Sequence, residues 1–288
     1  MSSSVLENLL VMYARRFPIR RGKLRIVNSL WHTLSNGSTR RVATLKHGDL
    51  RMPCDLSEML QRQFYFFGTY FLEEEMLRCW ADAAKGAKVV FDVGANAGIY
   101  SLAALAVEPD AVVHAFEPTP EIASRLRTTA NLNRLASLHV HEVAVLDHDG
   151  SAVLRRFRGE LGNNEGMNFV VHEPDNSETE QVRVVSLDRF CRERCLEQID
   201  LLKIDVQGHE LSVLKGAERL IANGQVRTIF IELNWARRIG QTCIATEVIQ
   251  FLSRSNYLFS EPCERLHWHA PGEWLRHLSD VVAYRSAS

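Results

Sequence analysis

The sequence predicts an α/β protein with a parallel sheet, and two observations lead to this fold class. From Lys88 onward, short apolar runs alternate with stretches compatible with helices, a pattern typical of parallel strands joined by crossover helices. One apolar run enters a glycine turn and is followed by an Ala/Leu-rich helix at 100–107. The expected strands are 89–93, 112–116, 139–145, 201–204 and 228–233.

Residues 1–85 differ from the rest and are interpreted as a cap or lid. They begin with an apolar helical stripe, continue through a basic run and reach strand-like pieces at 41–45 and 50–53. The segment 64–80 is aromatic at first and then helix-like. We expect it to dock the cap onto the main domain, 86–288.

A β insertion with a loop is expected within the main domain at 147–185. The chain there is richer in Gly, Asn, Glu and His, and apolar residues alternate at 152–157 and 181–185. Loops of this kind usually lie near a ligand.

The N-terminal part contains one dense basic run: Arg15, Arg16, Arg20, Arg21, Lys23 and Arg25. We interpret it as a solvated face beside a dimerisation helix, which implies a homodimer. Recognition of an anionic acceptor and contact with a membrane surface are the alternatives.

Composition indicates an ordinary globular protein. The 288 residues are 46% hydrophobic, and 34 Lys and Arg nearly balance 35 Asp and Glu, so the overall charge gives no reason to expect a nucleic-acid partner. The six cysteines contain no CxxC pair, so reduced thiols are expected. No apolar run approaches the roughly 18 residues of a membrane-spanning helix. We therefore expect a cytoplasmic protein without a transmembrane segment.

The turn after the first strand of the main domain has the residue types of a ligand site. Gly94 and Gly98 allow the backbone to turn tightly and approach a ligand, and the following helix presents N–H groups and a positive dipole end. Asp92 is placed where it could meet an ammonium group. Asn96 stands where a dinucleotide site has the glycine that makes room for pyrophosphate. These features favour a zwitterionic ligand such as S-adenosylmethionine over a nicotinamide dinucleotide.

Glu117 ends the next apolar run, nineteen residues after Gly98. An acidic residue at this point of a βαβ unit can accept hydrogen bonds from both ribose hydroxyls of an adenosine-type ligand. We also assign Glu142 to the cofactor site. A glycine turn made for helix packing, with a solvated Glu117, is the alternative interpretation.

In this region the sequence resembles the FkbM family of methyltransferases. The matching pieces are 91–98 (FDVGANAG), 116–120 (FEPTP), 131–133 (NLN), 185–188 (VSLD), 199–210 (IDLLKIDVQGHE), 214–217 (LKGA) and 231–232 (IE). The resemblance covers about residues 88–235. It implies a class I methyltransferase (Rossmann-like) fold, with a mainly parallel seven-stranded sheet and one antiparallel strand. It also implies methyl transfer from S-adenosylmethionine, usually to oxygen. One departure is Gln207, where many relatives carry Glu.

A polar cluster follows the strand 201–204, at the sheet edge where open α/β proteins bind ligands. Methyl transfer to a hydroxyl requires alignment of the reacting atoms and removal of the hydroxyl proton. We expect His209 or Asp205 to accept that proton, with His209 favoured, and Gln207 to orient the hydroxyl. The cluster consists of Lys203, Asp205, Gln207, His209 and Glu210.

The function predicted from the sequence is O-methylation of a small-molecule hydroxyl, on a sugar, polyketide or related natural product. A nicotinamide-dependent oxidoreductase and a non-catalytic protein that binds an adenosine ligand are the alternatives. No metal is predicted, because nothing in the spacing of Asp205, His209 and Glu232 demands one.

Overall fold

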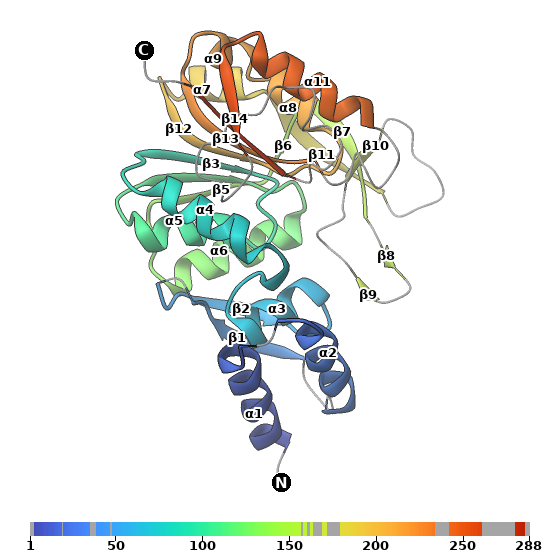
Figure 1. Ribbon diagram of the computed structural model, residues 1–288. Coiled ribbons are helices and arrows are strands. Elements are labelled where there is room, and N and C mark those ends of the chain that lie inside the picture. Colours follow the sequence, from blue (N-terminus) through green and yellow to red (C-terminus); the bar gives the residue numbers. More distant parts are fainter. Residues whose placement is uncertain are drawn as a thin grey trace.

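The computed structural model describes residues 3–18, 20–34, 39–46, 48–156, 158–159, 162–163, 169–171, 179–233, 242–260 and 280–285. These residues form a central sheet flanked by helices, a smaller sheet beside it and an N-terminal cap (Figure 1).

Within the described residues, the central sheet has seven strands in the order β14-β15-β13-β12-β3-β4-β5. Strand β15 is antiparallel to both of its neighbours, and the pairs from β13 to β5 are parallel. This confirms the mainly parallel seven-stranded sheet with one antiparallel strand. The bounds are β3 (Val89–Val93), β4 (Val112–Phe116), β5 (Leu138–His141), β12 (Ile199–Ile204), β13 (Val226–Glu232), β14 (Tyr257–Ser260) and β15 (Asp280–Arg285).

Helices cover both faces of this sheet. Val90 and Ala115 belong to a buried cluster with residues of α4, α5 and α6, whereas Phe91 and Phe116, one position further along each strand, belong to a second cluster with residues of α7, α8, α9 and α11. Because strand side chains alternate between faces, apolar runs in the sequence are the expected result. The helices are α4 (Glu74–Ala84), α5 (Ile99–Val107), α6 (Pro120–Leu132), α7 (Leu187–Glu193), α8 (Glu210–Lys215), α9 (Glu218–Ala222) and α11 (Thr242–Ser253).

The strand order reverses between β3 and β12. From β3 the chain proceeds outward through β4 and β5, while β12 and β13 lie on the other side. The loops that follow β3 and β12 therefore meet at one edge, and the Asp205 N–H donates to the Val93 carbonyl over 3.0 Å. Ligands bind at such switch points in open α/β sheets.

The N-terminal cap shares its core with one face of the sheet. Trp31 and Phe66 belong to the same buried cluster as Val90, so the cap is packed onto the main domain. The segment 64–80 begins in α3, which ends where Gly68 adopts a left-handed φ of 70°, and it continues through η1 into α4. The cap elements before α4 are α1 (Ser3–Arg16), α2 (Lys23–Leu34), β1 (Arg40–Thr44), β2 (Arg51–Asp55), α3 (Met59–Phe67) and η1 (Phe71–Glu73).

The predicted β insertion is confirmed as a four-stranded sheet in the order β10-β7-β11-β6. Its strands β7 and β11, which pair antiparallel, coincide with the two stretches of alternation in the sequence. The expected strand 139–145 is divided between β5 in the central sheet and β6 in the insertion. The insertion strands are β6 (Ala144–Val145), β7 (Gly150–Arg155), β10 (Phe169–Val171) and β11 (Thr179–Val185), with β8 (Arg158–Gly159) and β9 (Gly162–Asn163) forming a separate pair.

The cysteines differ from one another. Cys54 and Cys191 are buried free thiols and Cys195 is an exposed one, but Cys79 is disulfide-bonded. The expectation that the thiols are reduced is therefore wrong for Cys79.

Among the helices that the structure describes, none combines the length and the apolar character that crossing a membrane requires.

Candidate functional site

The glycine turn after β3 is held by neighbouring strands. Gly94, Asn96 and Gly98 have positive φ angles of 79°, 48° and 83°. The N–H groups of Gly94 and Ala95 both donate to the carbonyl of Phe116 at the end of β4, each over 3.0 Å. The turn is therefore fixed to the adjacent strand end, at the sheet edge where the sequence predicts a ligand.

Both predicted glycines are required by contacts within the protein. A Cβ on Gly94 would lie 1.8 Å from the carbonyl oxygen of Asp205, and a Cβ on Gly98 would lie 2.3 Å from a methyl group of Leu126 on α6. Gly94 thus lets the loops after β3 and β12 touch, and Gly98 lets α6 pack against the turn.

Glu117 follows β4 and joins two loops. Its side chain is only 5% exposed. One carboxylate oxygen accepts the Asn96 N–H over 3.0 Å, and the other accepts the Thr119 N–H over 2.8 Å. The structure therefore brings together Glu117 and the glycine turn, as the sequence predicts for a ligand that contacts both.

Asp92 lies beneath the turn. The carboxylate, 1% exposed, accepts hydrogen bonds from the backbone N–H of Ser101 over 3.0 Å and from its hydroxyl over 2.6 Å. Burial raises the pKa of Asp92. These bonds satisfy an N–H in the first turn of α5, a structural role that the sequence analysis did not identify. Contact of Asp92 with an ammonium group stays a prediction.

Glu142 lies one strand further along the same edge, directly after β5. The Glu117 N–H donates to the carbonyl of His141, so the two glutamates follow neighbouring strand ends. The Glu142 side chain is 41% exposed, and its carboxylate accepts a hydrogen bond from Arg127 on α6 over 2.9 Å.

The loop after β12 has an unusual backbone. Gln207 and Gly208 have consecutive positive φ angles of 54° and 107°. The Gln207 amide donates to a carboxylate oxygen of Asp205 over 2.7 Å, and the Gly208 N–H donates to Glu210 over 2.9 Å. Glu210 is 1% exposed, and burial raises its pKa to about 7. The buried Glu210 carboxyl therefore holds the backbone of the loop at Gly208, and Gln207 fixes the Asp205 side chain.

Asp205 lies among further polar groups, because Lys203 on β12 precedes it by two residues and Glu232 ends the neighbouring strand β13. The Lys203 ammonium, on a side chain 1% exposed, is 3.9 Å from the carboxylate of Asp205. Burial and the negative charges of Asp205 and Glu73 raise the pKa of Glu232, so this carboxyl holds a proton that hydrogen bonds to Asp205. The edge after β12 and β13 thus contains two carboxyls that share a proton beside a buried cation.

The cap contributes to the same cluster through Tyr70 and Glu73, and the sequence analysis assigned neither Glu73 nor its partner Tyr100 to a site. The Tyr100 hydroxyl donates to Glu73 of η1 over 2.7 Å, and the Lys203 ammonium lies 4.9 Å from the centre of the Tyr100 ring. The pKa of Tyr70 is raised, first by burial and then by the charges of Glu73, Glu232 and Asp205. Tyr70 and Glu73 therefore lie close to the predicted catalytic carboxylate.

His209 points toward the insertion. Its Nε2 lies 2.9 Å from the carbonyl oxygen of Val170 on β10, so Nε2 carries a proton and donates it. The side chain lines a pocket of about 500 Å³ between the insertion sheet and α8. The lining includes Leu146, Ala152, Val170, Gly208, His209 and Ser212.

The part of the chain that the structure describes contains no group of three His, Cys, Asp or Glu side chains placed to hold a metal ion.

Comparison with known proteins identifies relatives of the main domain. The model of the methyltransferase FkbM domain matches residues 92–259. The 31-O-demethyl-FK506 methyltransferase FkbM of Streptomyces tacrolimicus is 35% identical to this chain over 45% of the chain and 59% of that protein. The 2-O-methyltransferase NoeI of Sinorhizobium fredii is 30% identical over 50% of the chain and 62% of that protein. The chain thus spans less than two thirds of the length of these curated relatives.

Among solved structures, the S-adenosylhomocysteine-bound methyltransferase PaMTH1 of Podospora anserina is 10% identical, with a TM-score of 0.45 over 94% of this chain and 98% of that one.

Proposed function

Because the chain belongs to the FkbM family of methyltransferases, we propose that it transfers a methyl group from S-adenosylmethionine to a hydroxyl oxygen of a small molecule. The family match extends from β3 to β14 and so includes the loops after β3, β4 and β12. The names of two relatives specify an oxygen as the methylated atom, which supports oxygen here and an acceptor such as a sugar or polyketide hydroxyl.

One observation carries the proposal: the Glu117 carboxylate lies against the Asn96 N–H of the glycine turn. Two segments that were separately predicted to contact an adenosine-type ligand thus form one site. Each Glu117 oxygen accepts one backbone N–H, and an ionised carboxylate is an acceptor-only group, the type that two ribose hydroxyl donors require. This set of groups fits S-adenosylmethionine.

The donor's parts are assigned by this chemistry. The turn from Gly94 to Gly98 would hold the amino-acid end, Glu117 the ribose, and Glu142 would lie toward the base. Asp92 holds the first turn of α5 and would face the positively charged ammonium group of the donor. When bound, S-adenosylmethionine supplies a methyl group made electrophilic by the sulfonium that carries it.

On the acceptor side, Asp205 would receive the hydroxyl. Gln207 and the protonated Glu232 both donate hydrogen bonds to its carboxylate, and the Lys203 ammonium is 3.9 Å away. These three groups fix the direction of the Asp205 carboxylate. As the new C–O bond forms and the C–S bond breaks, the hydroxyl proton passes to a group of the protein. Alignment alone can contribute up to roughly 7 to 11 kcal/mol to the lowering of the barrier.

His209 is the proposed proton acceptor. Because Nε2 donates to the Val170 carbonyl, the neutral ring would take up a proton at Nδ1. The adjoining pocket, with a volume of about 500 Å³, has the size of a small-molecule site. The variant His209→Ala tests this role, because loss of a general base should lower kcat about 100-fold or more.

The cap would close the acceptor side. Tyr70 and Glu73 come from the segment between α3 and α4, and both interact with the cluster around Asp205 and Glu232. Their position supports the interpretation of residues 1–85 as a lid.

Calorimetry with S-adenosylhomocysteine tests the donor site. Replacing Glu117 by Gln should weaken binding by about 1.5 to 3 kcal/mol, the scale of hydrogen bonds to a charged group. The variant Glu197→Gln, at an exposed position after α7, is the matched control. Equal affinity of Glu117→Gln and the wild type for S-adenosylhomocysteine would remove Glu117 from the site. Binding of NAD by the wild type, without binding of S-adenosylhomocysteine, would favour an oxidoreductase. A screen by mass spectrometry for acceptors that gain one methyl group then tests turnover.

A further inference from the structure

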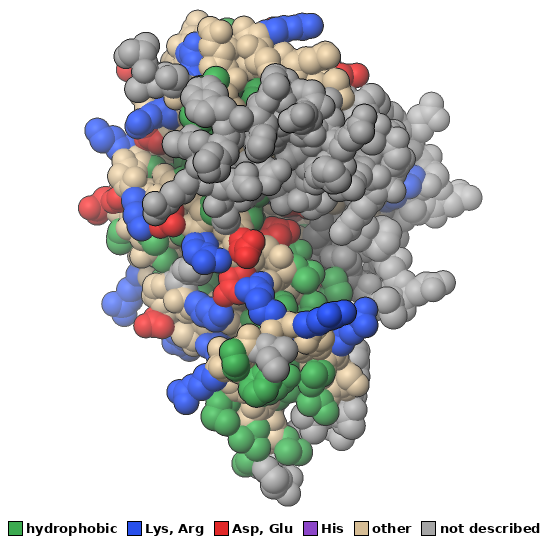
Figure 2. Space-filling model, viewed as in Figure 1, with side chains coloured by type: hydrophobic (Ala, Val, Ile, Leu, Met, Phe, Trp, Pro, Cys, Tyr) green, Lys and Arg blue, Asp and Glu red, His purple; other side chains and the backbone are tan. Residues whose placement is uncertain are grey.

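The helical hairpin formed by α1 and α2 exposes an apolar surface at the end of the molecule. Exposed large side chains recur every three or four residues along α1, which puts them on one face, whereas Leu10 and Ala14 are buried on the opposite side. Figure 2 shows hydrophobic side chains gathered at this end, with Lys and Arg beside them. The exposed apolar residues of the hairpin are Val5, Leu9, Met12, Phe17, Ile26 and Leu30, each between 44% and 49% exposed.

The exposed charged residues of the hairpin are all positive. Residues 1–34 contain six Lys and Arg but a single acidic residue, Glu7. Glu7 is 8% exposed and accepts hydrogen bonds from Arg41 and from the Tyr65 hydroxyl, each over 2.7 Å. Its negative charge is therefore directed into the cap and neutralised there.

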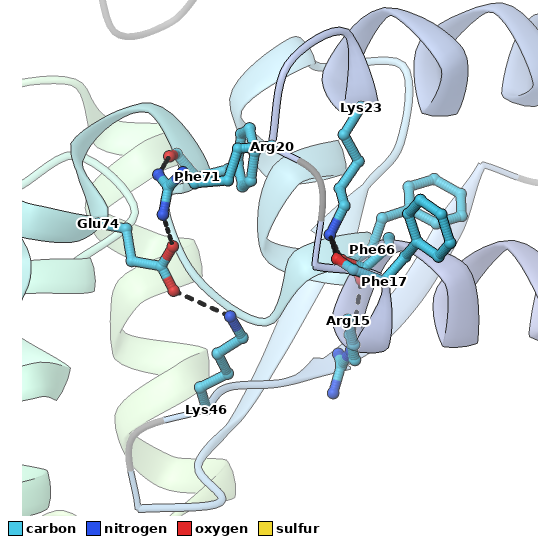
Figure 3. A network of polar contacts seen from close by, with 9 residues as sticks. Arg15, Phe17, Arg20, Lys23, Lys46, Phe66, Phe71 and Glu74 are labelled. Atoms are coloured by element: carbon cyan, nitrogen blue, oxygen red, sulfur yellow. Dashed lines mark hydrogen bonds and ion pairs between the residues drawn. The ribbon is translucent and has the colours of Figure 1, made fainter.

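Of the six basic residues, Arg15 and Arg20 tie the hairpin to the rest of the cap, and Lys23 joins α2 to α1 (Figure 3). Arg15 donates to the carbonyls of Thr44 and Tyr65, each over 2.9 Å. Arg20 pairs with Glu74 at 2.5 Å, and Lys23 is buried and donates to the Ala14 carbonyl over 3.0 Å.

The other three, Arg16, Arg21 and Arg25, are exposed. Arg16 continues the exposed face of α1, four residues after Met12. Arg21 follows α1 in the connection, and Arg25 lies in the first turn of α2 beside Ile26. Exposed guanidinium groups thus accompany the apolar side chains on both helices.

We propose that this surface docks on a membrane that contains anionic lipids. Apolar side chains that enter the interface, together with arginines that meet lipid phosphates, are the two contributions that peripheral binding requires. A second copy of the chain fits less well, because a two-fold contact through this surface would bring the exposed arginines of both copies together. The hairpin lies on the membrane in this arrangement and does not cross it.

Vesicle flotation tests this proposal with the full chain. The wild type should bind vesicles of phosphatidylcholine with 30% phosphatidylglycerol, and bind pure phosphatidylcholine vesicles at least tenfold more weakly. The variant Arg16→Gln/Arg21→Gln/Arg25→Gln should reduce partitioning into the anionic vesicles about 100-fold, from the known contribution of each basic residue near such a surface. Raising the salt to 0.5 M should also weaken binding.

Two further variants separate the contributions. Leu9→Ser/Met12→Ser keeps the charge and should also lose binding. The control Arg78→Gln/Arg192→Gln/Arg254→Gln removes the same charge from exposed positions on α4, on α7 and after α11, and should bind within about twofold of the wild type. Failure of the wild type to bind anionic vesicles would overturn the proposal, as would an equal loss in the control. Light scattering that shows a wild-type dimer, made monomeric by Leu9→Ser/Met12→Ser, would identify a second copy as the occupant instead.

Discussion

Replacing Gly94 by Ala tests the contact that joins the loops after β3 and β12. Gly94 has a φ of 79°, and an added Cβ would lie 1.8 Å from the carbonyl oxygen of Asp205 and 2.8 Å from its carbonyl carbon. Ordinary van der Waals contact begins near 3.4 Å, so the Asp205 backbone would have to retreat by about 1.6 Å. This movement would carry away the carboxylate proposed to receive the acceptor hydroxyl.

The chain offers a matched control for the magnitude. Gly86 has nearly the same φ, 76°, but an added Cβ there meets nothing within 4 Å. Gly86→Ala therefore incurs only the left-handed penalty of roughly 1 to 2 kcal/mol. Gly94→Ala incurs this penalty as well. It also strains the hydrogen bond from the Asp205 N–H to the Val93 carbonyl, which contributes about 1 kcal/mol, and the packing around Asp205. We expect a loss of about 3 to 5 kcal/mol in the free energy of unfolding.

Urea unfolding of both variants measures the difference directly. Calorimetry with S-adenosylhomocysteine at a temperature where Gly94→Ala stays folded should show donor affinity reduced at least tenfold, with Gly86→Ala close to the wild type. If the two variants lose equal stability and bind the donor equally well, the close approach of Gly94 and Asp205 does not exist in solution.

Three further predictions concern protonation and the acceptor side. Burial raises the pKa of Glu210 from 4.5 to about 7, so its stabilising contribution is present below pH 4.5 and lost as the pH rises through 7. Glu210→Gln should therefore be more stable than the wild type at pH 8, by up to about 3 kcal/mol, and this gain should vanish in urea unfolding at pH 4.5. Burial lowers the pKa values of His114 and His141 from 6.5 to about 3 and about 4, so stability should fall as the pH drops below 6.5, and His114→Asn/His141→Asn should flatten that slope. Asp205→Asn should lower kcat about 100-fold with little change in donor affinity, while excess EDTA should leave wild-type turnover unchanged; activity abolished by EDTA and restored by Mg²⁺ would contradict the prediction that methyl transfer needs no metal.

Much of the fold could be predicted from the sequence, because a buried parallel strand leaves an apolar run that is visible without coordinates. The strand, turn and helix around Gly94 were predicted to within a residue, and the alternation at 181–185 lies within β11. The sequence predicts one strand at 139–145 because the run is continuous, although β5 and β6 belong to different sheets. Apolar character reports burial, and it does not report which sheet a strand joins.

The candidate site was predicted in part for a related reason. Gly94 and Glu117 follow strands of one βαβ unit, so their proximity follows from local topology. Glu73 and Tyr100 could not be placed, since their contact depends on how the cap packs against α5. The supporting role of Glu210 was also obscure, because only the positive φ angles of the loop bring the Gly208 N–H to its carboxylate.

Lys203 explains how so many carboxyls can gather at the edge after β12. It is almost fully buried, and a buried ammonium is costly unless negative groups surround it. The strand register places it beside Asp92, and its charge lowers the pKa of Asp92 and of Glu232 against the effect of burial. One cation at the switch point is thus shared between Asp92 beneath the proposed donor site and the Asp205 and Glu232 pair at the proposed acceptor site. A lysine with a strongly hydrated point charge suits this position, because it can face several carboxyls at once without a fixed bidentate geometry.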